Sequence, residues 1–118
     1  MTTADLTIEL ILASSERELR GKILGLVGYG ALGREIASRA VTRGMEVIYA
    51  DPEPGAGPYR RVHLGELLAV SDFVLPLEAG AANTLRDERF VVLMKPGAEL
   101  VSLADVAQDA RQPQHQAG

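Results

Sequence analysis

The sequence predicts an α/β domain built on a doubly wound, parallel sheet of about five strands in the order 3-2-1-4-5. Two observations carry this prediction. Short apolar runs alternate along the chain with segments whose apolar residues recur at helical spacing, which is typical of parallel strands joined by right-handed crossover helices. A glycine-rich turn also connects the first apolar run to the helical pattern after it, as a tight strand-to-helix connection requires.

The elements of the first half follow in order. We expect a helix over residues 3–18 with a broad apolar surface, because Leu6, Leu10 and Ala13 share one face. An apolar run over 22–27 has the composition of a central strand that is covered on both faces. The next helix carries apolar residues at helical spacing up to Ala40, and Gly44 is placed to end it. A second strand is expected over 46–50.

The second half begins with a proline- and glycine-rich loop over 51–58. The elements expected after it are a third strand over 61–64, a short helix over 65–70, a fourth strand over 73–77, a helix over 84–94, a fifth strand over 99–103 and a further helix over 104–110. We expect residues 1–111 to form one domain and residues 112–118 to be a frayed tail.

Composition excludes several classes of function. The net charge of −4 argues against a nucleic-acid partner, which normally requires a basic patch. Without cysteine the chain has no disulfide or thiolate metal site, and we expect a cytoplasmic protein. No cluster of His, Asp and Glu has the spacing of metal ligands. The apolar segment over 6–13 contains Glu9 and follows no basic segment, so it indicates neither a signal peptide nor a membrane span.

The glycine turn Gly28-Tyr-Gly30-Ala-Leu-Gly33 has the G-x-G-x-x-G pattern of a dinucleotide site. Gly28 permits the tight turn, Gly30 leaves room for a pyrophosphate, and Gly33 lets the helix approach the strand. The helix that begins near Ala31 directs its free N–H groups at the anion. The predicted cofactor contacts of this turn are Gly28, Tyr29, Gly30, Ala31, Leu32 and Gly33.

Asp51 ends the second strand and is expected to accept hydrogen bonds from the adenosine ribose, with Pro52 beside it. Its charge would repel a 2′-phosphate, so the sequence predicts NAD rather than NADP. Arg60 and Arg61 would soften this preference only if the loop folded back, and we expect them to lie far from the strand end.

Several further segments resemble the NAD-binding domain of D-isomer-specific 2-hydroxyacid dehydrogenases, the phosphoglycerate dehydrogenase-like family. Together they cover about residues 4–103. Besides the glycine turn, the matching segments are Ala4-Asp-Leu-Thr-Ile-Glu-Leu-Ile-Leu-Ala13, Leu19-Arg-Gly-Lys-Ile-Leu-Gly25, Gly44-Met-Glu-Val-Ile-Tyr-Ala-Asp-Pro52, Glu66-Leu-Leu-Ala-Val-Ser-Asp72, Leu75-Pro-Leu77 and Leu93-Met-Lys-Pro-Gly-Ala98. The resemblance implies a Rossmann-type fold, NAD as cofactor, and Leu75 and Pro76 as additional cofactor contacts.

The resemblance also implies a catalytic Arg for the substrate carboxylate, a His as general acid–base and a Glu that orients the His. Asp105 stands where the Arg is expected, and the chain ends before the segments that would carry the Glu and the His. By the same resemblance, we expect no segment of this sequence to form the substrate lobe. His63 is not at a catalytic position of the family, so we predict no catalytic residue in this chain.

Three interpretations of function stay open at this level. The chain is an NAD-binding domain that is inactive alone, an oxidoreductase component completed by a partner chain, or an interaction module that has lost nucleotide binding. The broad apolar surface of the first helix also predicts a homodimer. In that dimer, replacing Ile8 or Ile11 with Asp is expected to dissociate the two copies while leaving the α/β core intact.

Overall fold

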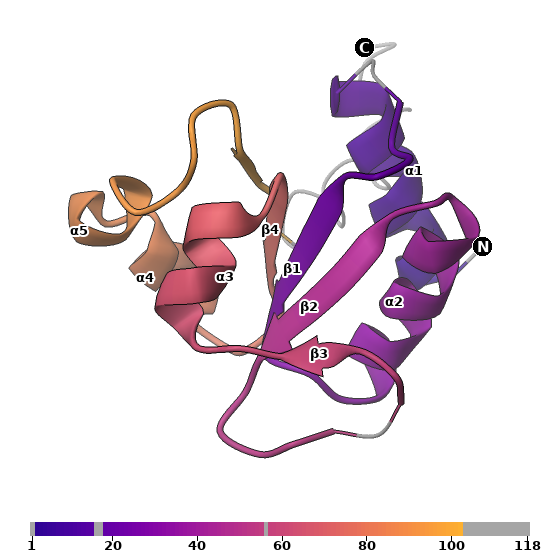
Figure 1. The fold of residues 1–118 in the computed structure, drawn as a ribbon, viewed down its shortest axis with the longest axis horizontal. Coiled ribbons are helices and arrows are strands. Elements are labelled where there is room, and N and C mark those ends of the chain that lie inside the picture. The colour runs from indigo at the N-terminus through magenta and orange to yellow at the C-terminus, as the bar shows by residue number, and fades with distance from the viewer. Residues whose placement is uncertain (1, 16–17, 56, 103–118) are drawn as a thin grey trace, which may run out of the picture.

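The computed structural model describes residues 2–15, 18–55 and 57–102 and confirms the predicted sheet. Its strands are all parallel and lie in the order β3-β2-β1-β4-β5 (Figure 1). The strands are β1 Ile23–Val27, β2 Glu46–Ala50, β3 Arg60–Arg61, β4 Phe73–Pro76 and β5 Glu99–Leu100. The helices are α1 Thr3–Ser15, α2 Ala31–Thr42, α3 Leu64–Val70, α4 Ala81–Leu85 and α5 Glu88–Val91.

Helices cover both faces of the sheet, so the central strands are buried on both sides. In Figure 1, α1 and α2 lie on one side of the sheet and α3, α4 and α5 on the other. Neighbouring residues of a strand face opposite sides: Phe73 and Leu75 belong to the core cluster under α1 and α2, whereas Val74 belongs to the cluster under α3. This explains the unbroken apolar runs in the sequence.

Gly25, in the middle of β1, allows α3 to pack closely on the sheet. A Cβ added there would lie 2.2 Å from Oγ of Ser71 and 2.7 Å from the side chain of Leu67. Both distances are shorter than any carbon atom tolerates, so every other residue at this position would push α3 away. This glycine therefore serves packing and has no part in the glycine turn.

The first helix packs more completely than its sequence predicts. Ile8 is 3% exposed and Ile11 is 0% exposed, and both belong to the core cluster between α1, α2 and the sheet. Arg39 of α2 donates a hydrogen bond to Asp5 of α1, which lowers the pKa of that carboxyl to about 2. The expectation that Asp at position 8 or 11 would spare the core is therefore wrong, because both side chains are part of it.

Two element predictions are also wrong. The expected helix over 84–94 is divided into α4 and α5, because the Asp87 carboxylate accepts a hydrogen bond from the Arg89 N–H and caps a new helix. The third strand begins and ends earlier than the expected 61–64, at Arg60–Arg61, and His63 precedes α3 as its N-cap residue. Within the described residues, the other predicted strands and helices agree within a few residues at their ends.

Some predictions fall on residues outside the described part of the chain. These are residues 16–17 of the first helix, the end of the fifth strand at Leu103, the helix over 104–110, the position of Asp105, and the domain boundary between residues 111 and 112. They stay predictions. Within the described residues, no helix combines the length and the apolar character needed to cross a lipid bilayer.

Asp72, which precedes β4, links the N-terminal ends of β1 and β4. Its carboxylate accepts a hydrogen bond from the Ile23 N–H at 2.8 Å and lies 2.9 Å from the ammonium group of Lys95. Burial alone would raise the pKa of Asp72, but these two partners outweigh it and hold the pKa below its ordinary value. The carboxylate therefore stays charged and fixes the sheet edge opposite to the glycine turn.

Candidate dinucleotide-binding site

Strand register brings three loops together at the carboxyl-terminal edge of the sheet. Val27, the last residue of β1, lies opposite Ala50 of β2 on one side and Pro76 of β4 on the other. The glycine turn, Asp51 and Leu77 follow these three residues directly. The chain also changes direction across the sheet here, since β3 lies on one side of β1 and β4 on the other. Ligands of open α/β sheets bind at such a switch point.

Gly28 and Gly33 give the turn its shape. Gly28 has a φ of 97°, which side chains rarely adopt, and a Cβ there would lie 2.6 Å from Cγ of Glu78. Its N–H donates to the Ala50 carbonyl at 2.7 Å. A Cβ at Gly33 would lie 3.3 Å from side-chain atoms of both Leu77 and Tyr29. The backbone of the protein itself therefore requires glycine at Gly28, and Gly33 allows Leu77 and Tyr29 to pack closely on the start of α2.

Gly30 differs from them because the surrounding protein leaves room for a side chain at this position. Its φ of 169° is ordinary extended backbone, and a Cβ there would meet nothing within 4 Å. Gly30 is the N-cap residue of α2, where no side chain caps the helix and no acidic residue lies in the first turn. Open space in front of uncapped N–H groups fits a pyrophosphate.

Asp51 is held in place from two directions. One carboxylate oxygen accepts a hydrogen bond from the Tyr29 N–H at 2.8 Å, and the other accepts one from the Glu53 N–H at 2.9 Å. Each oxygen keeps a lone pair for a further donor. A carboxylate fixed at the end of β2 in this way can accept hydrogen bonds from two neighbouring hydroxyl groups, as a ribose offers.

Three tyrosines hold Gly55 and the residues just before β3 against the glycine turn. The Tyr29 ring stacks on Tyr49 with 4.3 Å between the centroids and meets Tyr59 edge-on at 6.4 Å. The Tyr49 hydroxyl accepts a hydrogen bond from the Gly55 N–H at 2.9 Å. Burial raises the pKa of Tyr29. The side chain of Tyr29 thus packs against the loop, and the groups of the turn that can contact a ligand are those of its backbone.

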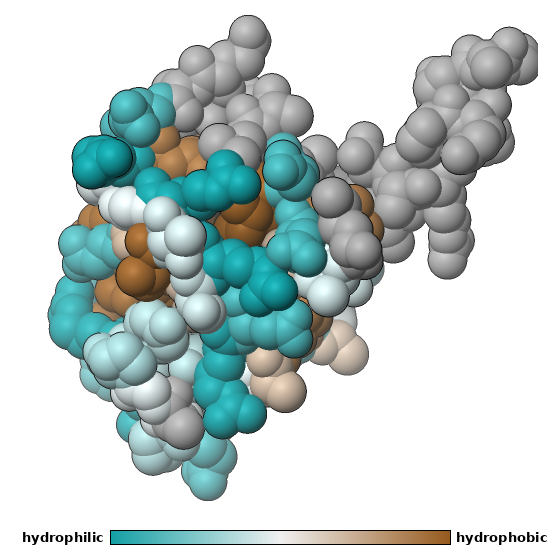
Figure 2. Space-filling model, turned by 90° about the vertical axis from the view of Figure 1, so that its right-hand side faces the viewer, coloured by the Kyte–Doolittle hydropathy of each residue, from teal (hydrophilic) through white to brown (hydrophobic). Residues whose placement is uncertain are grey.

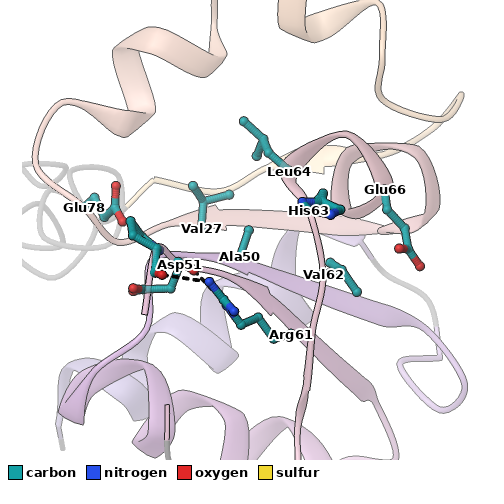
Figure 3. Close-up of a pocket in the computed structure, with 10 residues that line it drawn as sticks. Val27, Ala50, Asp51, Arg61, Val62, His63, Leu64, Glu66 and Glu78 are labelled. Carbon is teal, nitrogen blue, oxygen red and sulfur yellow. Dashed lines mark hydrogen bonds between the residues drawn. The ribbon is translucent and has the colours of Figure 1, made fainter. Parts of the chain in front are cut away.

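Three cavities adjoin this edge. The large cavity, of about 580 Å³, lies between the ends of β1 and β2 on one side and the start of α3 on the other (Figure 3). The turn cavity, of about 210 Å³, runs along the glycine turn, and the loop cavity, of about 200 Å³, lies between Gly30, Arg34 and the loop after Asp51. Glu78 lines both the large and the turn cavity, and Asp51 lines both the large and the loop cavity.

The structure gathers most of the residues expected at the site. Every residue of the glycine turn from Gly28 to Gly33 lines the turn cavity, and Asp51 and Pro52 line the large cavity. Leu75 and Pro76 are buried within β4, and the cavities are lined by the next two residues, Leu77 and Glu78. The assignment of Leu75 and Pro76 to the cofactor stays a prediction.

Arg61 lies beside Asp51, at the end of β2, and not far from it as the sequence analysis expects. Its Nε donates to the Asp51 carbonyl at 3.0 Å, and its second terminal nitrogen donates to the Pro52 carbonyl at 2.7 Å. The expectation that Arg61 is far from the strand end is wrong, because β3 pairs with β2 and places Tyr49 opposite Arg61. Glu78, Arg34 and His63 also line the cavities without having been predicted to do so.

Comparison with known proteins agrees with this geometry. Residues 11–107 match the model of the D-isomer specific 2-hydroxyacid dehydrogenase, NAD binding domain. The chain is 38% identical over 93 residues to hydroxypyruvate reductase of Thermotoga maritima, covering 75% of this chain and 30% of that protein. It is 41% identical over 98 residues to glyoxylate reductase of Pyrococcus furiosus, covering 74% of this chain and 28% of that protein.

A solved structure has a similar fold. The TT0316 protein from Thermus thermophilus superposes with a TM-score of 0.75 at 29% identity, over 92% of this chain and 45% of that one. The chain thus spans less than half of the solved structure and less than a third of these two curated relatives. It belongs to the D-isomer specific 2-hydroxyacid dehydrogenase family and corresponds to the NAD-binding domain of that family.

Proposed function

We propose that this chain binds NAD along the three cavities and has no dehydrogenase activity of its own. The observation that carries the proposal is Gly30, whose missing side chain leaves open space before the uncapped N-terminus of α2. The pyrophosphate would lie there, with the adenosine ribose on Asp51. Bound NAD would supply the hydride acceptor, while this chain's residues hold and orient it. A fluorescence titration with NADH tests the proposal, and a signal without enhancement or blue shift would contradict it.

Asp51 is proposed to set a preference for NAD over NADP. The 2′-phosphate of NADP would lie beside the Asp51 carboxylate, and repulsion between these two negative charges would weaken NADP binding. Replacing Asp51 with Ala is expected to weaken NADH binding and to narrow the difference between NADH and NADPH by about tenfold. Titrations of both cofactors against both proteins measure this. Equal affinity of the unmodified protein for NADH and NADPH would refute the role given to Asp51.

Purified chain is expected to show no turnover of D-2-hydroxy acids. By the family resemblance, Asp105 stands where an Arg holds the substrate carboxylate, and loss of a general acid–base alone costs about 10²–10⁴ in rate. The measurement is NADH formation with a panel of D-2-hydroxy acids, with and without added cell extract. Sustained, stereospecific turnover by the pure protein contradicts the proposal. Turnover that requires extract supports completion by a partner chain.

We further propose that two copies associate through α1, in the cytoplasm. Figure 2 views the molecule from the side of Figure 1 that carries α1 and α2, and shows brown, hydrophobic areas between hydrophilic side chains. Leu6 on α1 is half-buried, and Val41 at the end of α2 is 49% exposed. Such apolar side chains favour association.

Sedimentation equilibrium at tens of micromolar tests the dimer. We expect a species of twice the chain mass of 12.6 kDa. Replacing Leu6 with Lys should dissociate it. The matched control is Val92→Lys, which places the same charge on a side chain that is 71% exposed near α5, on the other face of the sheet. A single species at the chain mass, or equal dissociation by both variants, would rule out the α1 interface.

A further inference from the structure

The large cavity is lined by a cationic side chain, Arg61, to which the proposed NAD site assigns no contact with the cofactor. Arg61 belongs to β3 and is exposed, and in Figure 3 its side chain runs along the edge of the cavity towards Asp51. Its Nε and one terminal nitrogen donate to the carbonyls of Asp51 and Pro52. Two hydrogen bonds from one guanidinium fix its plane as well as its position.

The geometry of these bonds leaves the flat faces of the guanidinium available. Guanidinium N–H groups point outward within the plane of the group, so the bonds to the two carbonyls engage its edge and not its faces. The cavity is lined by polar residues, among them His63, Glu66 and Glu78, and by the apolar side chains of Val27, Ala50 and Leu64. A planar ring placed between these apolar side chains and Arg61 would meet a hydrophobic wall on one side and a flat cation on the other.

We propose that Arg61 is the stacking platform for the adenine ring of the cofactor. This inference rests on the proposed NAD site, because Asp51 places the ribose at the mouth of the same cavity. An aromatic ring stacked on a guanidinium gains electrostatic attraction from its π-system together with the hydrophobic contact. Arg61 is thus a binding residue that acts on the base, whereas Asp51 acts on the ribose.

Arg60 provides a matched control. It is the neighbouring residue of β3 and is also exposed, but its guanidinium pairs with Glu66 at 3.0 Å and does not line the cavity. Arg60→Ala removes the same charge from the same strand without removing the platform. Arg61→Lys keeps the charge and a donor for a carbonyl but has no flat face.

The experiment measures NADH affinity by fluorescence titration and ADP-ribose affinity by calorimetry, for the unmodified chain and the three variants. We expect Arg61→Ala to weaken both ligands by about fivefold. Arg61→Lys should weaken them to nearly the same extent, and Arg60→Ala should leave both unchanged. Because the platform touches the base, NADH and NADPH should lose affinity by the same factor. Melting curves followed by circular dichroism confirm that each variant is folded.

Several results would overturn the platform. These are unchanged affinity in Arg61→Ala, full affinity in Arg61→Lys, an equal loss in Arg60→Ala, and a changed ratio of NADH to NADPH affinity, which would place Arg61 at the 2′ position instead. Unchanged ADP-ribose binding beside weakened NADH binding would also overturn it. Failure of the unmodified chain to bind NADH is a separate outcome, since it refutes the proposed function itself.

Discussion

Replacing Gly30 with Val is expected to weaken NADH binding by at least about a hundredfold while leaving the fold intact. The new side chain meets no protein atom within 4 Å, and the backbone at Gly30 is extended, so the protein can accept it. The space that it fills is the proposed path of the pyrophosphate. Valine is also a poorer N-cap residue than glycine, so we expect a small loss of stability, well under about 2 kcal/mol.

Two further glycine variants make this prediction specific. Gly28→Ala should lower the melting temperature, since its φ is 97° and the new Cβ would lie 2.6 Å from Cγ of Glu78. Gly65→Ala on α3 also enters open space and should change neither stability nor binding by much. If Gly30→Val bound NADH as the unmodified chain does, the pyrophosphate could not lie at this turn.

Replacing Ile11 with Asp is expected to destabilise the whole domain strongly. Ile11 is 0% exposed in the core cluster shared by α1, α2 and the sheet, so the variant would bury a carboxylate without a partner. The lost apolar contacts and the buried charge together cost about 4 kcal/mol or more, a large part of the roughly 5–15 kcal/mol that stabilise a domain. Urea unfolding followed by circular dichroism measures the loss.

Leu6→Lys is the control for this variant, because Leu6 lies on the same helix but is only half-buried. It should cost much less stability than Ile11→Asp, whatever it does to association. A folded Ile11→Asp variant with an unchanged urea midpoint would mean that α1 does not pack on the core as the structure shows.

The features that could be predicted are those that neighbouring residues determine. The turn from Gly28 to Gly33 and the position of Asp51 could be predicted because each strand end is followed within a few residues of the sequence by the glycines, the helix start or the acidic residue that mark the site. The apolar run of β1 likewise shows that the strand is covered on both faces. The strand order follows from the alternation of elements and from the rules for parallel crossovers.

The features that could not be predicted depend on pairing between distant segments. Arg61 comes ten residues after Asp51, and only the pairing of β3 with β2 returns it to the carbonyls of Asp51 and Pro52. Glu78 reaches Gly28 because Pro76 lies opposite Val27. The division between α4 and α5 is different, since the Asp87 cap is a local signal that the apolar pattern over 84–94 obscured.

The position of a bound nucleotide decides whether the glycine turn is the cofactor site. A crystal structure of the chain soaked with NAD should show the pyrophosphate over Gly30 and the first turn of α2, with the adenosine ribose hydroxyls bonded to Asp51. The adenine should lie in the large cavity against Arg61. A nucleotide bound elsewhere, or a glycine turn that stays empty at millimolar NAD while the crystal leaves it accessible, would show that the turn is not the NAD site.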